Sequence, residues 1–68
     1  MQEIKVRDEF IKLGQALKAA DLVSSGVEAK IVVQDGQVEV NGEVDTRRGR
    51  KLVPEDVITF DGKSVKIV

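Results

Sequence analysis

The chain has 68 residues and a formal net charge of −1, with no cysteine, no histidine and only two aromatic residues. Its length allows one hydrophobic core, so we expect a single domain over residues 1–68 and no deep pocket for a small-molecule substrate. The missing side chains exclude disulfides, thiolate metal sites and the commonest general base, so we expect no enzyme, no metal and no cofactor.

The first part of the chain predicts a short strand and then a helix. Ile4 and Val6 alternate with polar residues, as in a half-buried strand, and Asp8 is placed to cap the helix that follows. Gly14 lies inside this helix, and a close approach of another backbone segment would account for a glycine there. Apolar residues recur at helical spacing through about residue 19, namely Phe10, Leu13, Leu17 and Ala20.

A second helix is predicted to begin after Ser25. Ser25 and Glu28 have the spacing of a capping box, in which a serine hydroxyl and a glutamate carboxylate each accept a backbone N–H. Gly36 is placed to end this helix, because glycine adopts the left-handed conformation without strain. The buried face is expected to carry Ala29, Val32 and Val33.

After Gly36 the apolar residues alternate, which predicts strands. Asn41-Gly42 is the strongest hairpin signal in the chain, and it separates a strand over residues 38–40 from one at Val44. The remaining signals are a turn at residues 54–56 and a hairpin around Asp61-Gly62, with strands over residues 57–60 and 65–67.

The element order indicates an α+β fold, with the helix pair packed on one side of a small antiparallel sheet of about four to five short strands. The longest apolar run, residues 31–33, is far shorter than the roughly 20 residues of a membrane span, so we expect no membrane association. The start of the chain lacks a secretory signal, and the absence of cysteine suits a reducing compartment. We therefore expect a cytoplasmic monomer.

Positive charge is concentrated in the segment Thr46-Arg47-Arg48-Gly49-Arg50-Lys51, here called the basic segment. It holds four of the 11 basic residues, and the rest of the chain is acidic on balance. An anionic partner would relieve the repulsion within this segment, and nucleic acid is the largest class of such partners. Arginine matches phosphate oxygens with its fork of donors, and Gly49 would let the backbone turn sharply. Taken alone, a solvated loop that protects a sheet edge fits the segment equally well.

The order and spacing of these signals resemble the S-four RNA-binding domain, which is named after ribosomal small-subunit protein four. The resemblance runs from about Leu13 to Phe60. It is carried by the helix pair, by Ser25-x-x-Glu28-Ala29-Lys30, by Gly36-x-Val38-x-Val40-Asn41-Gly42, and by the basic segment with the closing hairpin. The run from Thr46 to Leu52 further resembles small stand-alone bacterial members, in which this domain is nearly the whole protein.

The resemblance implies binding to structured RNA, such as ribosomal RNA or an assembling ribosomal subunit, through phosphate and shape contacts. Lys18 matches no family position and is left out of the expected site. Many members have an acidic residue at the position of Gly14 and an arginine at that of Gly26. Because that arginine is missing, we expect the basic segment to carry more of the RNA binding than the helix pair. The positions that match RNA-facing residues of the family are Lys12, Lys30, Arg47, Arg48, Arg50 and Lys51.

Two further expectations concern the partner and the loop. Both rings, Phe10 and Phe60, fall at expected core positions, which leaves none to stack on unpaired bases and favours folded RNA. The alternative is a protein-interaction module that docks the basic segment on an acidic partner surface. Four close positive charges also suggest that the segment is mobile when free. The acidic residues are expected to form a solvated surface without a magnesium site: Glu39, Glu43, Asp45, Glu55, Asp56 and Asp61.

Overall fold

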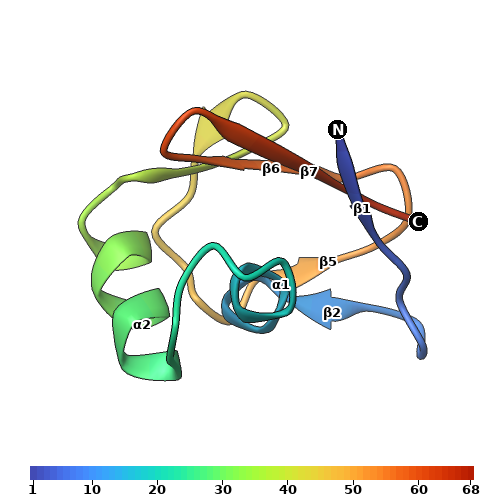
Figure 1. The fold of residues 1–68 in the computed structure, drawn as a ribbon, viewed down its shortest axis with the longest axis horizontal. Helices are drawn as coiled ribbons and strands as arrows, with labels where there is room; N and C mark the ends of the chain where they lie inside the picture. Colours follow the sequence, from blue (N-terminus) through green and yellow to red (C-terminus); the bar gives the residue numbers. More distant parts are fainter.

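The computed structural model describes residues 1–68 and has two helices on one side of a sheet, with a smaller sheet beside the first helix (Figure 1). This arrangement confirms the expected α+β class. The elements in chain order are β1 (Gln2–Ile4), β2 (Ile11–Lys12), α1 (Leu13–Ala19), α2 (Gly26–Gln34), β3 (Val38–Val40), β4 (Glu43–Val44), β5 (Lys51–Leu52), β6 (Val57–Phe60) and β7 (Lys63–Ile67).

The larger sheet has five strands in the order β1-β7-β6-β3-β4. Three of its pairs are antiparallel, but β1 runs parallel to β7, with Gln2 opposite Val65 and Ile4 opposite Ile67. The expectation of a purely antiparallel sheet was therefore wrong. Both helices and five strands separate β1 from β7, and a connection of that length allows parallel entry. The smaller sheet is an antiparallel pair of β2 and β5, which the sequence pattern did not predict.

Both predicted hairpins are confirmed. Asn41 and Gly42 have φ values of 54° and 86°, and Asp61 and Gly62 have values of 53° and 75°. Positive φ at both central residues is the signature of the two-residue turn whose twist matches that of the flanking strands. These turns place β4 beside β3 and β7 beside β6.

The core lies between the larger sheet and the helices. The alternation of β3, β6 and β7 turns one set of side chains toward α1 and α2, and the other set away from them. The largest fully buried side chains come from both helices and from four strands: Leu13, Leu17, Val33, Val38, Val40, Leu52, Ile58, Val65 and Ile67. Ala29, Val32 and Val33 are all buried, which confirms the predicted inner face of α2.

The first helix ends at Ala19 as expected, but it begins later than predicted. Asp8 does not cap it; the N-cap is Lys12, whose extended backbone (φ −77°, ψ 149°) belongs to β2. Pairing with β5 keeps these residues extended, so the apolar spacing before Leu13 is not helical. Phe10 lies outside the helix and is half-buried, and it is not part of the core.

The second helix has the predicted cap and stop. The Ser25 hydroxyl accepts the backbone N–H of Glu28 at 3.1 Å, while the Glu28 carboxylate accepts from the N–H and hydroxyl of Ser24 instead of closing on Ser25. Gly36 has φ of 79°, and the two backbone N–H groups after Asp35 donate to carbonyls of the last turn. Neither helix has the length and apolar character needed to cross a membrane.

Candidate functional site

The basic segment forms a tight turn between β4 and β5. The Arg50 backbone N–H donates to the Arg47 carbonyl at 3.1 Å, which leaves Arg48 and Gly49 at the tip. We call residues 47–50 the basic turn. Just before it, the Asp45 N–H donates to the Val38 carbonyl at 3.1 Å and extends the pairing of β3 with β4 by one residue. The turn therefore starts from the sheet itself.

The carboxylate of Asp45 holds the basic turn from inside. Asp45 is 6% exposed and accepts four hydrogen bonds. Three come from Arg47, through its backbone N–H (2.9 Å), Nε (3.1 Å) and Nη2 (2.9 Å), and one comes from Arg50 Nη1 (2.7 Å). The side-chain bond from Arg47 is the largest cause that holds the pKa of Asp45 well below its usual range, and the same bond raises the pKa of Arg47.

The expectation of a solvated acidic surface is wrong for two of its residues. Asp45 is not part of a solvated acidic surface, because it is buried under two arginines that satisfy its oxygens. Asp56 is also only half-exposed, and it accepts bonds from Asn41 Nδ2 and the Val53 N–H. Mobility of the basic segment in the free protein stays a prediction; in this structure the carboxylate is hydrogen-bonded to residues at both ends of the turn.

The basic turn is also bonded to the start of α1. The first N–H groups of a helix have no partner within the helix. Here the Leu13 N–H donates to the Arg50 carbonyl at 2.8 Å and the Gly14 N–H donates to the Arg48 carbonyl at 3.1 Å. A Cβ added at Gly14 would lie 2.8 Å from Cγ of Arg48. The close approach expected at Gly14 is therefore confirmed, and the segment that approaches is the basic turn.

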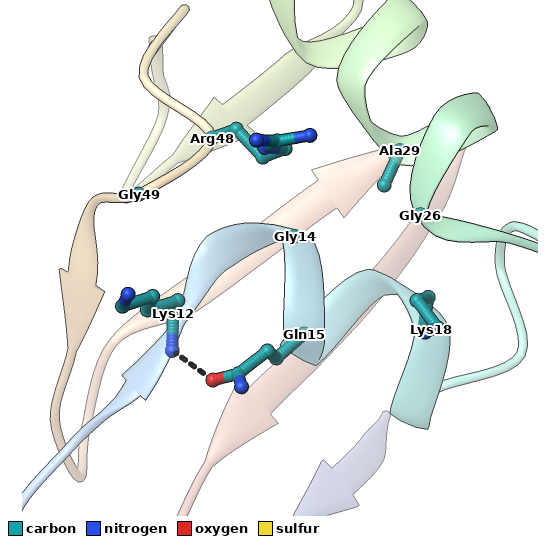
Figure 2. A pocket seen from close by; sticks show the side chains of 8 residues that line it. All are labelled: Lys12, Gly14, Gln15, Lys18, Gly26, Ala29, Arg48 and Gly49. Atoms are coloured by element: carbon teal, nitrogen blue, oxygen red, sulfur yellow. Dashed lines mark hydrogen bonds between the residues drawn. The ribbon is translucent and has the colours of Figure 1, made fainter.

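A shallow hollow of about 280 Å³ lies where the basic turn meets the two helices. Figure 2 shows the Arg48 side chain extending from the turn toward the helix that carries Ala29. Two lysines and one arginine line this hollow, and no carboxylate does. Its lining residues are Lys12, Gly14, Gln15, Lys18, Gly26, Ala29, Arg48 and Gly49.

Two of the expected site residues, Lys12 and Arg48, line the hollow. Lys51 lies directly opposite Lys12 in the pairing of β2 with β5, and its Nζ is 4.8 Å from the centroid of the Phe10 ring. Facing like charges destabilise a sheet, whereas an ammonium over a ring is favourable. The structure thus brings Lys51 next to Lys12, at the edge of the same basic surface, and places its ammonium over one face of Phe10.

The other expected residues are placed less centrally. The side chains of Arg47 and Arg50 are 72% and 31% exposed, and both share their charge with Asp45. Lys30 is exposed on α2 and does not line the hollow. Lys18, which the family pattern left out, does line it. The available signal was helical spacing, because Lys18 follows Gly14 by four residues and so shares its face of α1.

Comparison with known proteins gives the family of this chain. The model of the S4 domain, the S-four domain named above, matches residues 4–68. The chain belongs to the S4 domain family. The match includes every element that borders the hollow, so the residues described above lie within the domain that defines the family.

Three relatives are similar over most of this chain. RlbA of Bacillus subtilis, named as a probable ribosome maturation protein, is 48% identical over 59 residues, which cover 87% of this chain and 83% of RlbA. YbcJ of Escherichia coli, named as a candidate RNA-binding protein, is 40% identical over 58 residues, which cover 85% and 83%. The small ribosomal subunit protein uS4m of Schizosaccharomyces pombe is 39% identical over 54 residues, covering 79% of this chain and 16% of that protein.

The solution structure of YbcJ, described as having a motif involved in RNA binding, superimposes on this chain with a TM-score of 0.77. The aligned residues are 35% identical and cover all of this chain and 87% of YbcJ. The likeness extends over both sheets and both helices, so it supports the fold as a whole rather than one motif.

Proposed function

We propose that this S4 domain protein binds structured RNA through the basic turn and the hollow, and that its target is ribosomal RNA or an assembling ribosomal subunit. The observation that carries the proposal is the convergence of Lys12, Lys18 and Arg48 on a hollow without a carboxylate. Family membership and the named role of RlbA in ribosome maturation support the choice of RNA over other polyanions.

The contacts that this surface offers are to phosphates. Arg48 presents a planar fork that bonds two phosphate oxygens at once, and Lys12 and Lys18 present point charges. Each phosphate neutralised releases counterions, so affinity should fall steeply with salt. For about four to six contacts we expect a log–log salt slope of about −3 to −5.

The surface offers little for base recognition. Lys51 lies over one face of Phe10, Phe60 packs against the core, and both rings are half-buried, so neither is a fully exposed platform for stacking. Reading of unpaired bases usually depends on such rings, whereas folded RNA is recognised through backbone shape and phosphates. The side chains at hand therefore favour a double-helical or compactly folded RNA target.

The experiment is a binding titration of fluorescently labelled, structured ribosomal RNA fragments, with a DNA duplex of matched length, across a salt series. Wild type is compared with Lys12→Ala/Arg48→Ala, which removes two cations of the hollow. We expect wild type to prefer the RNA. The double variant should bind more weakly, with a salt slope less steep by about 1.5 to 2.

The matched control is Lys63→Ala/Lys66→Ala, which removes the same charge from β7, where neither residue lines the hollow. A site at the hollow predicts a much smaller loss for this control. Equal losses for the two variants would indicate attraction by overall charge without a defined site. Failure of wild type to bind any RNA fragment at low salt would refute the proposal and favour an acidic protein partner.

A further inference from the structure

We infer that Asp45, although negatively charged, is a positioning residue for RNA binding. Its carboxylate fixes Arg47 and Arg50 in the free protein, so that the basic turn has its binding shape before RNA arrives. The inference rests on the proposed function, because it concerns how that surface meets phosphates. The inference gives an acidic residue a role in a site where a phosphate-binding function would lead one to expect only cations.

The geometry leaves both arginines able to bond outward. A guanidinium has five N–H donors. Arg47 gives Asp45 its Nε–H and one hydrogen of Nη2, and Arg50 gives one hydrogen of Nη1, so most donors of both remain. Arg47 in addition keeps 72% of its side chain exposed. The carboxylate therefore orients both guanidinium groups and leaves most of their N–H donors free for phosphates.

The backbone is held by the same group. Asp45 accepts the Arg47 backbone N–H two residues on, which is a local turn typical of aspartate. The Arg48 and Arg50 carbonyls that follow cap α1 by accepting from Gly14 and Leu13. A shift of the turn at Asp45 would therefore move the Arg48 backbone and its side chain over the hollow.

Two effects of opposite sign decide what loss of the carboxylate does. Removing a negative charge close to bound phosphates strengthens binding, but in the high dielectric of a water-exposed surface one such charge changes the affinity only by about threefold to fivefold. Releasing two arginines means that both must be ordered when RNA binds, which weakens binding by roughly tenfold. The second effect is larger, so neutralising Asp45 should weaken binding to a polyanion.

The test is Asp45→Asn, a change of nearly equal shape, assayed with the same labelled ribosomal RNA fragment. The control is Glu43→Gln, because Glu43 is exposed on neighbouring β4, takes no part in the ion pairs of the protein and loses the same charge. We expect Asp45→Asn to bind about twofold to threefold more weakly than wild type, and Glu43→Gln to bind equally or more tightly. Binding by Asp45→Asn as tight as wild type, or tighter, overturns the positioning role.

A general loss of folding is separated from positioning by repeating the change in an Arg47→Ala/Arg50→Ala background. In that background asparagine can still accept the backbone N–H of residue 47, so the turn is kept and only the two guanidinium groups are missing. If Asp45 acts by orienting these arginines, Asp45→Asn therefore no longer weakens binding there. An equal loss in both backgrounds shows a merely structural effect and rejects the inference. In the free protein, the Arg47 Nε–H signal in a ¹H–¹⁵N spectrum should exchange slowly in wild type and rapidly in Asp45→Asn.

The two proposals fail in different ways. If wild type binds no RNA, the proposed function is refuted and the positioning role falls with it. If wild type binds RNA and Asp45→Asn behaves like Glu43→Gln, the proposed function stands and only the positioning role is lost. If Arg47 Nε–H exchanges rapidly in wild type, the arginines are not held in advance, and the inference fails even when RNA binds.

Discussion

Gly14 lies in the first turn of α1, where the basic turn passes close over the helix. Alanine here would raise helix propensity by about 1 kcal/mol. Its Cβ, however, would lie 2.8 Å from Cγ of Arg48, an atom near the backbone that has little freedom to move aside. The gain in helix propensity and the clash have opposite effects on the free energy of unfolding. Only the clash displaces Arg48 at the proposed binding surface.

We therefore expect Gly14→Ala to change the free energy of unfolding by no more than about 1 kcal/mol while lowering RNA affinity several-fold. Urea unfolding and the fluorescence titration measure the two quantities. The matched comparison is the same change made in Arg48→Ala, where the clashing side chain is absent and no further loss should occur. An undiminished loss in that background would show that Gly14 acts through something other than Arg48.

For individual residues, the sequence identified the cations of the basic turn but not the aspartate that holds them. The charge pattern and the family pattern pointed to Arg47, Arg48 and Arg50, and all three lie in one turn. Asp45 was misjudged because the sequence alone does not distinguish a buried aspartate from the exposed acidic residues scattered around it. The usable signal was local: an aspartate two residues before an arginine has the spacing of a side-chain turn.

Among the elements, α2 depends most clearly on one cap. The Ser25 hydroxyl accepts the Glu28 N–H at the N-terminal end of α2, and this end borders the hollow. Replacing a serine N-cap by alanine costs about 1 kcal/mol, which for a domain of this size lowers the Tm by about 4–8 °C. We expect this shift for Ser25→Ala in a thermal melt followed by circular dichroism.

Ser24→Ala provides the comparison. It removes the hydroxyl bond to Glu28 but keeps the backbone N–H bond at 2.7 Å, which is the largest cause of the lowered pKa of Glu28. Its Tm should fall less than that of Ser25→Ala. A fall of equal size for both would mean that the exposed serine pair, rather than the N-cap alone, stabilises the start of α2.

Elements with a periodic or turn signal were predictable, and elements defined by distant partners were not. The valines of β3, the Asn41-Gly42 turn and the stop at Gly36 all follow from local chemistry. By contrast, β2 and β5 have two residues each and exist because they pair with each other. Too short to show alternation, β2 was read as part of the helix that follows it.

For the whole molecule, acid should be a strong destabiliser. Asp45 has a pKa far below its ordinary value of 3.8, so between these values the unfolded chain binds a proton that the folded protein does not. Burial raises the pKa of Asp56, but its bonds from Asn41 and Val53 outweigh this and leave the pKa lowered. Stability from both carboxylates is thus full near neutral pH and lost as pH falls.

We expect the free energy of unfolding, from urea melts between pH 7 and pH 2.5, to begin falling near pH 5 and to drop progressively below pH 4. Asp45 should contribute about 2 kcal/mol of this loss, the scale of a hydrogen-bonded charged group. Asp45→Asn should be less stable at pH 7 and have a shallower pH profile. Parallel profiles for the two proteins would show that Asp45 is not the group responsible.

The parallel pairing of β1 with β7 has a consequence for the order of folding. The two hairpins and the helix pair join residues close along the chain, so their closure loses little chain entropy and should be early. The contact of β1 with β7 spans almost all 68 residues and should be among the last to form. Because none of β1 lines the hollow, the basic surface can assemble before that final strand docks, and a nascent chain could meet its RNA while β1 is still unpaired.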